Sequence, residues 1–194
     1  MNKILSDQEV IALAYERRDS LVKITCDLVQ IDSQTPPSDT LAVAEKVATA
    51  LADLPFFSVE LHQSEAPVVN LVARLDGGLP GRRLILNGHL DTYPMGDHKN
   101  WTYPPLSGEI VDGRLYGRGS ADMKGGIAAL IETVKIYATH LRPFPGEIVL
   151  TLAGDEESMG ELGTQWLIDN IPAVKGDGVI VADVGSPSSV RLGE

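Results

Sequence analysis

Three short apolar runs in this sequence are each followed closely by histidine or acidic residues. Residues 84–86 precede His89 and Asp91, residues 148–153 precede Asp155, Glu156 and Glu157, and residues 179–182 precede Asp183. Continuous apolar runs of this length are typical of strands buried on both faces. Because ligand sites in open α/β sheets lie beyond the carboxyl ends of parallel strands, we expect these polar side chains to meet at one edge of a sheet.

A cluster of carboxylates at one edge is electrostatically unfavourable unless positive charge lies among them, and a divalent metal ion supplies that charge. One histidine with several carboxylates suits Zn²⁺, Co²⁺ or Mn²⁺ better than Ca²⁺, which prefers oxygen ligands alone. The alternative is that each acid caps the helix that follows it. That explanation suffices at any one position, but its coincidence at all three strand ends favours a metal site.

Asp122 lies in a glycine-rich segment, residues 117–126, just before apolar residues at helical spacing, and we expect it to open that helix. So many glycines around one acid indicate unusual backbone angles or very close packing. The segment is not a dinucleotide fingerprint, because its third glycine is missing and a hairpin, rather than a buried strand, precedes it. Nor is it a phosphate loop, because Lys124 precedes the glycines and no Ser or Thr follows it.

The rest of the sequence predicts strands alternating with helices. Ser6 and Glu9 have the spacing of a capping box, and we expect a helix from there to about Val29. Asp112-Gly113 indicates a hairpin between residues 109–111 and 114–116. The remaining expected elements are helices from near residues 39–40 to 54, over 127–138 and over 162–168, and strands near 59–61 and over 68–75. This alternation predicts an α/β fold, a mostly parallel central sheet with helices on both faces.

Composition narrows the classes of partner and location. The chain has 194 residues, 43% of them hydrophobic, and a net charge of −11. Binding phosphates takes clustered Lys and Arg, so we predict neither nucleic acid nor an anionic membrane as a partner. Cys26 is the only cysteine and lies among apolar helical neighbours, which indicates a core thiol. The opening residues Met1-Asn2-Lys3 resemble neither a signal peptide nor a membrane span, so we predict a cytoplasmic location.

Three motifs together resemble a known family. Residues 87–92 (Asn-Gly-His-Leu-Asp-Thr), 117–126 and 155–157 match, in order and spacing, the dizinc metallopeptidases and amidohydrolases. That family includes acetylornithine deacetylase, succinyl-diaminopimelate desuccinylase, aminoacylase and carboxypeptidase G. Softer features agree, namely residues 33–36 and Trp101 with residues 104–105, so the resemblance covers essentially the whole chain.

The resemblance implies a role for each motif residue. His89 would be a terminal ligand to one metal. Asp91 would orient the His89 imidazole without binding the metal itself. Asp122 would bridge both metals, and the peptide bond after it would be cis. Asp183 falls where the family places its acidic ligand to the first metal. Many members carry Glu-Pro at that position, whereas Asp-x-Gly looks more like the dipeptidase and aminopeptidase branches.

For the second metal, the resemblance implies that Glu157 is a ligand and Glu156 the general base. Two metals about 3.5–4 Å apart would lower the pKa of a shared water and polarise the scissile amide carbonyl. Glu156 would take the proton of that water and deliver it to the leaving amine. The implied cofactor is Zn²⁺, two per full-length subunit, with Co²⁺ or Mn²⁺ as substitutes.

The resemblance also implies that residues 1–194 are the amino-terminal part of the catalytic domain. The family adds a smaller lid and dimerisation domain, and a later histidine that completes the second metal position. His62, His98 and His140 match no family ligand. We therefore expect His89, Asp122 and Asp183 to complete one metal position here, and the full-length protein to be a homodimer.

The predicted function is hydrolysis of an amide bond in an N-acyl amino acid or short peptide. The alternative from another class is a non-catalytic metal-binding fragment that keeps the fold without turnover. A two-metal aminopeptidase of a neighbouring family is a third reading, against which the glycine-rich stretch around Asp122 argues.

Overall fold

The computed structural model of this protein describes residues 5–185. Residues 1–4, on which the prediction of no signal peptide rests, and residues 186–194 lie outside that range. The α-helices within it are α1 (Asp7–Glu16), α2 (Arg18–Val29), α3 (Leu41–Leu51), α4 (Gly125–Ile136) and α5 (Trp166–Asn170). None of the helices between residues 5 and 185 is long and apolar enough to cross a bilayer.

The strands form one central sheet and one separate hairpin. The central sheet has the order β1-β2-β6-β3-β7, and the hairpin joins β4 to β5. The strands are β1 (Phe57–Glu65), β2 (Val68–Asp76), β3 (Gly78–His89), β4 (Glu109–Val111), β5 (Arg114–Tyr116), β6 (Phe144–Ala153) and β7 (Gly178–Val181). The hairpin has the predicted bounds, because Asp112 and Gly113 both adopt the positive φ that a tight turn of this kind requires.

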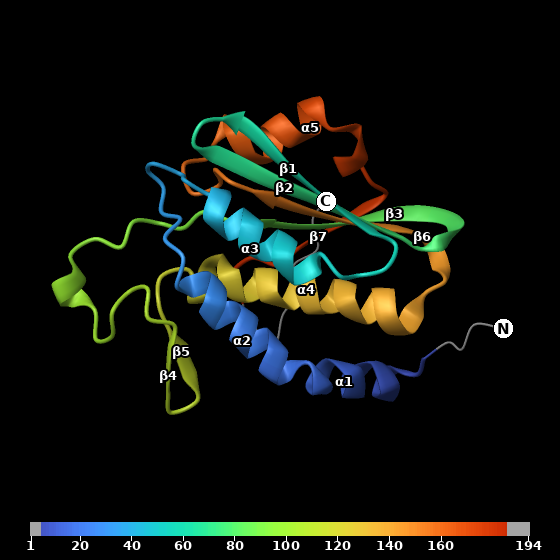
Figure 1. The fold of residues 1–194 in the computed structure, drawn as a ribbon, viewed down its shortest axis with the longest axis horizontal. Helices are drawn as coiled ribbons and strands as arrows, with labels where there is room; N and C mark the ends of the chain where they lie inside the picture. Colours follow the sequence, from blue (N-terminus) through green and yellow to red (C-terminus); the bar gives the residue numbers. More distant parts are fainter. Residues whose placement is uncertain (1–4, 186–194) are drawn as a thin grey trace.

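Pairing in the central sheet is mixed. β3 pairs in parallel with both β6 and β7, whereas β2 pairs antiparallel with β1 and with β6. The α/β class and the helices on both faces are confirmed (Figure 1). The predicted parallel arrangement applies to the three strands that precede the polar residues, while β1 and β2 form an antiparallel hairpin at the other edge.

The core follows from the alternation of side chains along the strands. One face, covered by α2, α3 and α4, buries Leu71, Leu86 and Leu150. The opposite face, covered by α5 (Figure 1), buries Val72, Ile85 and Val149. Successive residues of a strand point to opposite faces, so both faces of the three central strands are apolar and covered. These strands therefore give the carboxyl edge of the sheet a rigid base.

The first predicted helix is divided in two. The capping box forms, with the Glu9 amide donating to Ser6 Oγ at 3.4 Å and the Ser6 amide donating to Glu9 Oε2 at 2.9 Å. The helix ends at Glu16, and α2 begins at Arg18. No residue of α1 (Asp7–Glu16) is buried, whereas α2 buries Thr25, Leu28 and Val29. The two helices separate because only α2 packs into the core.

The prediction that the third apolar run is a buried strand is wrong for the described chain. β7 lies at the edge of the sheet, and Val179, Ile180 and Val181 are 61%, 52% and 55% exposed. Within residues 5–185 its only strand partner is β3. An apolar run indicates that a strand suits burial, but burial also requires neighbours on both faces.

Candidate metal centre

The carboxyl ends of the parallel strands meet at one edge, as predicted. In the β3–β6 register His89 is level with Ala153, and in the β3–β7 register Asn87 is level with Val181. The residues that follow each strand therefore begin at nearly the same height. This register brings His89, Glu156 and Asp183 to one cleft of about 290 Å³.

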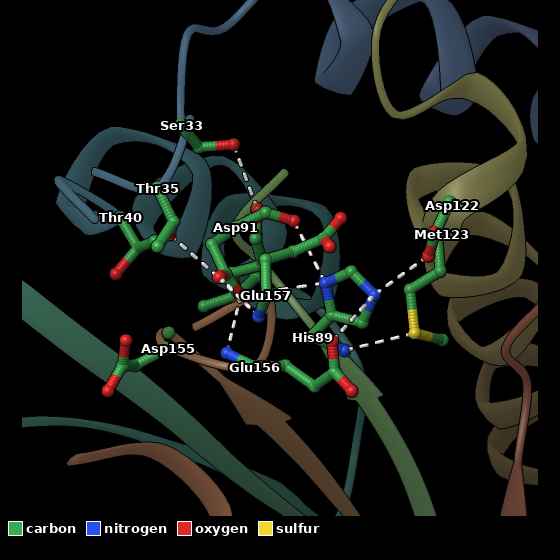
Figure 2. Close-up of polar contacts among 12 residues, drawn as sticks. Ser33, Thr35, Thr40, His89, Asp91, Asp122, Met123, Asp155, Glu156 and Glu157 are labelled. Carbon is green, nitrogen blue, oxygen red and sulfur yellow. Dashed lines mark hydrogen bonds and ion pairs between the residues drawn. The ribbon is translucent and has the colours of Figure 1, made fainter. Parts of the chain in front are cut away.

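His89 lies at the centre of the site and is 1% exposed. Its Nδ1 is 2.9 Å from the backbone carbonyl oxygen of Asp91, and its Nε2 is 3.0 Å from Oδ1 of Asp122 (Figure 2). A carbonyl oxygen only accepts, so Nδ1 carries a proton. The other nitrogen, Nε2, therefore presents its lone pair toward Asp122 whenever the ring is neutral.

Asp91 is fully buried, and each of its carboxylate oxygens is hydrogen-bonded. Oδ1 accepts the Glu156 amide at 3.0 Å, and Oδ2 accepts both the Glu157 amide at 3.0 Å and the Thr35 hydroxyl at 2.8 Å. Burial alone would raise the pKa of Asp91, but His89 and these donors hold that pKa below its ordinary value. Asp91 is therefore an ionised carboxylate that joins three segments of the chain.

Asp122 precedes α4 rather than opening it. Asp122 and Met123 have non-helical backbone angles, the peptide bond between them is cis, and α4 begins at Gly125. The expected close packing is present at Gly126, where a Cβ atom would collide with the carbonyl oxygen of Ala182. Met123 is buried behind the site, and its sulfur accepts the His89 amide at 3.1 Å.

Three of the predicted ligands converge. One nitrogen of His89 and one carboxylate oxygen each from Asp122 and Asp183 lie within 4.8 Å of one another. One imidazole and two carboxylates are a donor set that suits a tetrahedral divalent metal and leaves one position open. Within residues 5–185, no other histidine joins this group.

The two predicted glutamates lie beside this trio in different settings. Glu156 Oε2 is 3.9 Å from His89 Nε2, and its side chain is half exposed. Glu157 lies outside the trio, and its Oε1 accepts the Tyr93 amide at 2.9 Å. Asp155, the first acid of the same run, is buried, accepts the Ser158 hydroxyl and points away from His89 (Figure 2).

The electrostatics show crowded negative charge. Burial, followed by repulsion from Asp183, Asp91 and Asp122, raises the pKa of Glu156 despite the opposing effect of His89. Burial and then the charge of Asp122 likewise raise the pKa of Glu157.

Burial alone would lower the pKa of His89, but hydrogen bonds and charge from Asp91 and Asp122 raise it to about 9. Protonation of the carboxylates and of His89 is one answer to this crowding, and a bound divalent cation is another.

The sequence did not reveal the role of Thr35, whose hydroxyl reaches Asp91 from 56 positions away. The only signal was its place in residues 33–36, one of the softer family features. Nothing in the sequence indicated the contacts of Met123 or of the Tyr93 amide, because both depend on how distant segments pack.

Comparison with known proteins gives consistent results. Residues 85–194 match the sequence model of peptidase family M20/M25/M40. The succinyl-diaminopimelate desuccinylase of Rhodospirillum centenum is 39% identical over 173 residues, which are 88% of this chain and 44% of that protein. Succinyl-diaminopimelate desuccinylase 1 of a Ruegeria species is 38% identical over 168 residues, or 86% and 42%. The chain thus spans less than half the length of these relatives.

Solved structures share the fold at lower identity. Human carnosine dipeptidase 1 matches with a TM-score of 0.77 and 23% identity, over 91% of this chain and 41% of that one. The dipeptidase Dug1p of Saccharomyces cerevisiae matches with a TM-score of 0.76 and 20% identity, over 91% and 40%. At this identity the likeness shows a common architecture.

Proposed function

This chain belongs to peptidase family M20/M25/M40, and on that premise we propose that it is the amino-terminal part of a metal-dependent amide hydrolase. The observation that carries the proposal is the convergence of His89, Asp122 and Asp183 within 4.8 Å at the carboxyl edge of the sheet. The proposed substrates are N-acyl amino acids or short peptides. The desuccinylases among the relatives support the N-acyl class.

We propose that His89, Asp122 and Asp183 hold one metal, with Asp122 shared with a second position to which Glu157 contributes. Zn²⁺ is the proposed ion, and Co²⁺ or Mn²⁺ are accepted substitutes. Two bound metal ions would lower the pKa of a water between them and polarise the scissile carbonyl. The influence of the Asp122 charge on Glu157 supports placing both carboxylates around one shared region.

Glu156 is the proposed general base. It lies in the cleft beside His89, and its raised pKa brings it closer to the neutral range in which a base both takes and returns a proton. Glu156 takes the proton of the attacking water and passes it to the leaving amine. The backbone carbonyl of Asp91 accepts from Nδ1 and so keeps His89 in the tautomer that presents Nε2. The ionised side chain of Asp91 favours the same arrangement.

The domain organisation proposed for the whole protein follows from the same family. Residues 1–194 form the amino-terminal part of the catalytic domain, and the lid domain and carboxyl-terminal part lie outside this chain. A homodimer and a cytoplasmic location stay predictions for the full-length protein.

Replacing Glu156 by Gln in the full-length protein tests this proposal. We expect kcat for N-succinyl or N-acetyl amino acids to fall by about 10²–10⁴-fold while the metal content stays unchanged, because Gln cannot take a proton. An unchanged kcat would remove Glu156 as the base. Asp177→Asn is a matched acidic control, since Asp177 accepts the Arg83 amide in the middle of β3, away from the carboxyl end where the site lies.

A second candidate is a metal-binding fragment without turnover. The exposed edge strand β7 favours it for the chain of 194 residues, because Asp183 follows a strand with little support. Metal binding by this chain without hydrolysis, beside an active full-length protein, would assign that role to the fragment alone.

A further inference from the structure

We infer that Thr35 is a positioning residue: its hydroxyl fixes the Asp91 carboxylate, which in turn holds the backbone amides of Glu156 and Glu157 and so places both glutamates beside His89. The inference deepens the proposed function. Its consequence for metal binding rests on that function, whereas the hydrogen-bond arrangement itself does not and can be tested in metal-free protein.

Asp91 connects the two halves of the site through its carboxylate. Its two oxygens accept consecutive amides, those of Glu156 and Glu157, each at 3.0 Å. The segment that carries the two glutamates follows β6, whereas Asp91 follows β3. The orientation of the Asp91 carboxylate therefore determines where that segment lies relative to His89.

Thr35 reaches this carboxylate from a third segment. Residues 33–35 run beside residues 90–92, with the Thr35 amide donating to the Thr92 carbonyl at 2.8 Å and the Thr92 amide donating to the Ser33 carbonyl at 3.0 Å. Thr35 is 7% exposed, and its hydroxyl lies 2.8 Å from Oδ2 of Asp91. The backbone pairing fixes Thr35, so its hydroxyl meets the carboxylate in one defined direction.

The direction of each hydrogen bond follows from the geometry around Thr35. Its hydroxyl has a single proton and donates it to Oδ2 of Asp91 at 2.8 Å. Ser38 Oγ lies 2.8 Å from Thr35 Oγ1, and Ser38 must then be the donor in that pair. The hydrogen bond from Ser38 thereby stabilises the rotamer in which Thr35 faces Asp91. Two successive hydrogen bonds thus lead from Ser38 through Thr35 to Asp91.

The test uses Thr35→Val, which keeps the branched shape and removes the donor, in the 194-residue chain. Thr35→Ser should restore the donor. Ser33→Ala is the matched control, because Ser33 lies in the same segment, is also buried, and donates at 2.9 Å to the Leu90 carbonyl instead of to Asp91. The readout is amide hydrogen exchange measured by NMR in metal-free protein.

We expect Thr35→Val to accelerate exchange at the Glu156 and Glu157 amides by about tenfold, because a hydrogen bond to a buried charge is lost. The Leu90 amide, which donates to Ala153 between β3 and β6, should keep its rate and report any general loosening. Thr35→Ser and Ser33→Ala should leave the two glutamate amides near wild type. Unchanged exchange at these amides in Thr35→Val, or an equal rise at Leu90, would overturn the inference.

If the valine variant does not fold, Ser38→Ala provides a second test. It removes the donor that orients Thr35 and should accelerate exchange at the same two amides by roughly threefold. An unchanged rate there would overturn the inference as well.

Metal binding gives an independent readout. We expect Thr35→Val to weaken Co²⁺ binding by about 10–100-fold, as is usual for residues that orient ligands, and Ser33→Ala to weaken it far less. Equal Co²⁺ affinity in wild type and Thr35→Val would overturn the positioning role at the metal. Failure of the wild-type chain to bind Co²⁺ would count against the proposed function, while the exchange rates would still decide the role of Thr35.

Discussion

His89, the last residue of β3, and Asp91, two residues later, are 1% and 0% exposed, whereas Asp183, which follows β7, is exposed. The β3 side is held by β6, by the segment of Thr35 and by the amides of Glu156 and Glu157. The β7 side rests on a single described strand pairing. The imidazole is therefore held by buried contacts on several sides, whereas the Asp183 carboxylate is exposed and is held by fewer contacts.

The largest expected effect concerns metal affinity on the two sides. His89→Ala should weaken Co²⁺ binding by more than about 100-fold, because loss of a preorganised ligand exceeds loss of the residues that orient one. Asp183→Ala should weaken it by about tenfold, since ordering an exposed carboxylate offsets part of what it contributes. Competition with a chelator measures both constants. Equal losses would remove the distinction between the two sides.

Stability should separate the two aspartates in the same way. Asp91→Ala leaves the Thr35 hydroxyl and two backbone amides without their buried acceptor, and it removes the carboxylate that faces His89 while keeping the backbone carbonyl to which Nδ1 is bonded. We expect it to lower the free energy of unfolding by about 3–5 kcal/mol. Asp183→Ala should change it by no more than about 0.5 kcal/mol. Urea denaturation of the metal-free chain checks both values, and a large loss in Asp183→Ala would show that the β7 side is well supported.

A pair of neighbouring apolar residues sharpens the comparison without touching the site. Leu86 and Ile180 are partners in the β3–β7 register, but Leu86 is 2% exposed and Ile180 is 52% exposed. Leu86→Ala should cost about 2–5 kcal/mol of unfolding free energy, because it leaves a cavity in the core. Ile180→Ala should cost less than about 1 kcal/mol. Similar losses would mean that β7 is covered in solution.

The pH dependence of the metal-free chain tests the protonation of His89, at the end of β3. The pKa of His89 is about 9, above its ordinary value of 6.5, so its contribution to stability is complete below pH 6.5 and is lost as pH rises through 9. We expect the free energy of unfolding to fall by about 1 kcal/mol per pH unit from roughly pH 6.5 to 8.

His89→Gln serves as the control for that slope and should flatten it. Above about pH 8 the buried Lys124 contributes the opposite slope, because burial lowers its pKa to about 8 and the unfolded chain then binds the extra proton. A wild-type slope that persists unchanged in His89→Gln would contradict the assignment.

Local signals in the sequence predicted much of the fold. The hairpin at Asp112-Gly113 and the capping box at Ser6 formed as expected, because each depends on residues close together in the chain. The end of α1 at Glu16 was not predicted, because no Gly or Pro marks it. The break depends instead on packing, since α2 reaches the core and α1 does not. The exposure of β7 was missed because an apolar run carries no information about its neighbours.

The convergence of the side chains of the site could be predicted where they follow the ends of parallel strands. His89, Asp122 and Asp183 converge because parallel strands and a glycine-rich turn fix their positions, and both features are visible in the sequence. The Thr35 contact was not predictable, because it joins residues 56 positions apart through a segment without a regular pattern. Long-range hydrogen bonds of this kind depend on the packed structure.

The most direct test of the central claim, one metal position built by His89, Asp122 and Asp183, is metal content per chain. The 194-residue chain is loaded with Zn²⁺, separated from loose ions and analysed beside Asp122→Ala. We predict about one Zn²⁺ per wild-type chain and nearly none in Asp122→Ala, because Asp122 supplies one of the three converging ligands. A folded wild-type chain without zinc, or equal zinc in both proteins, would contradict the account.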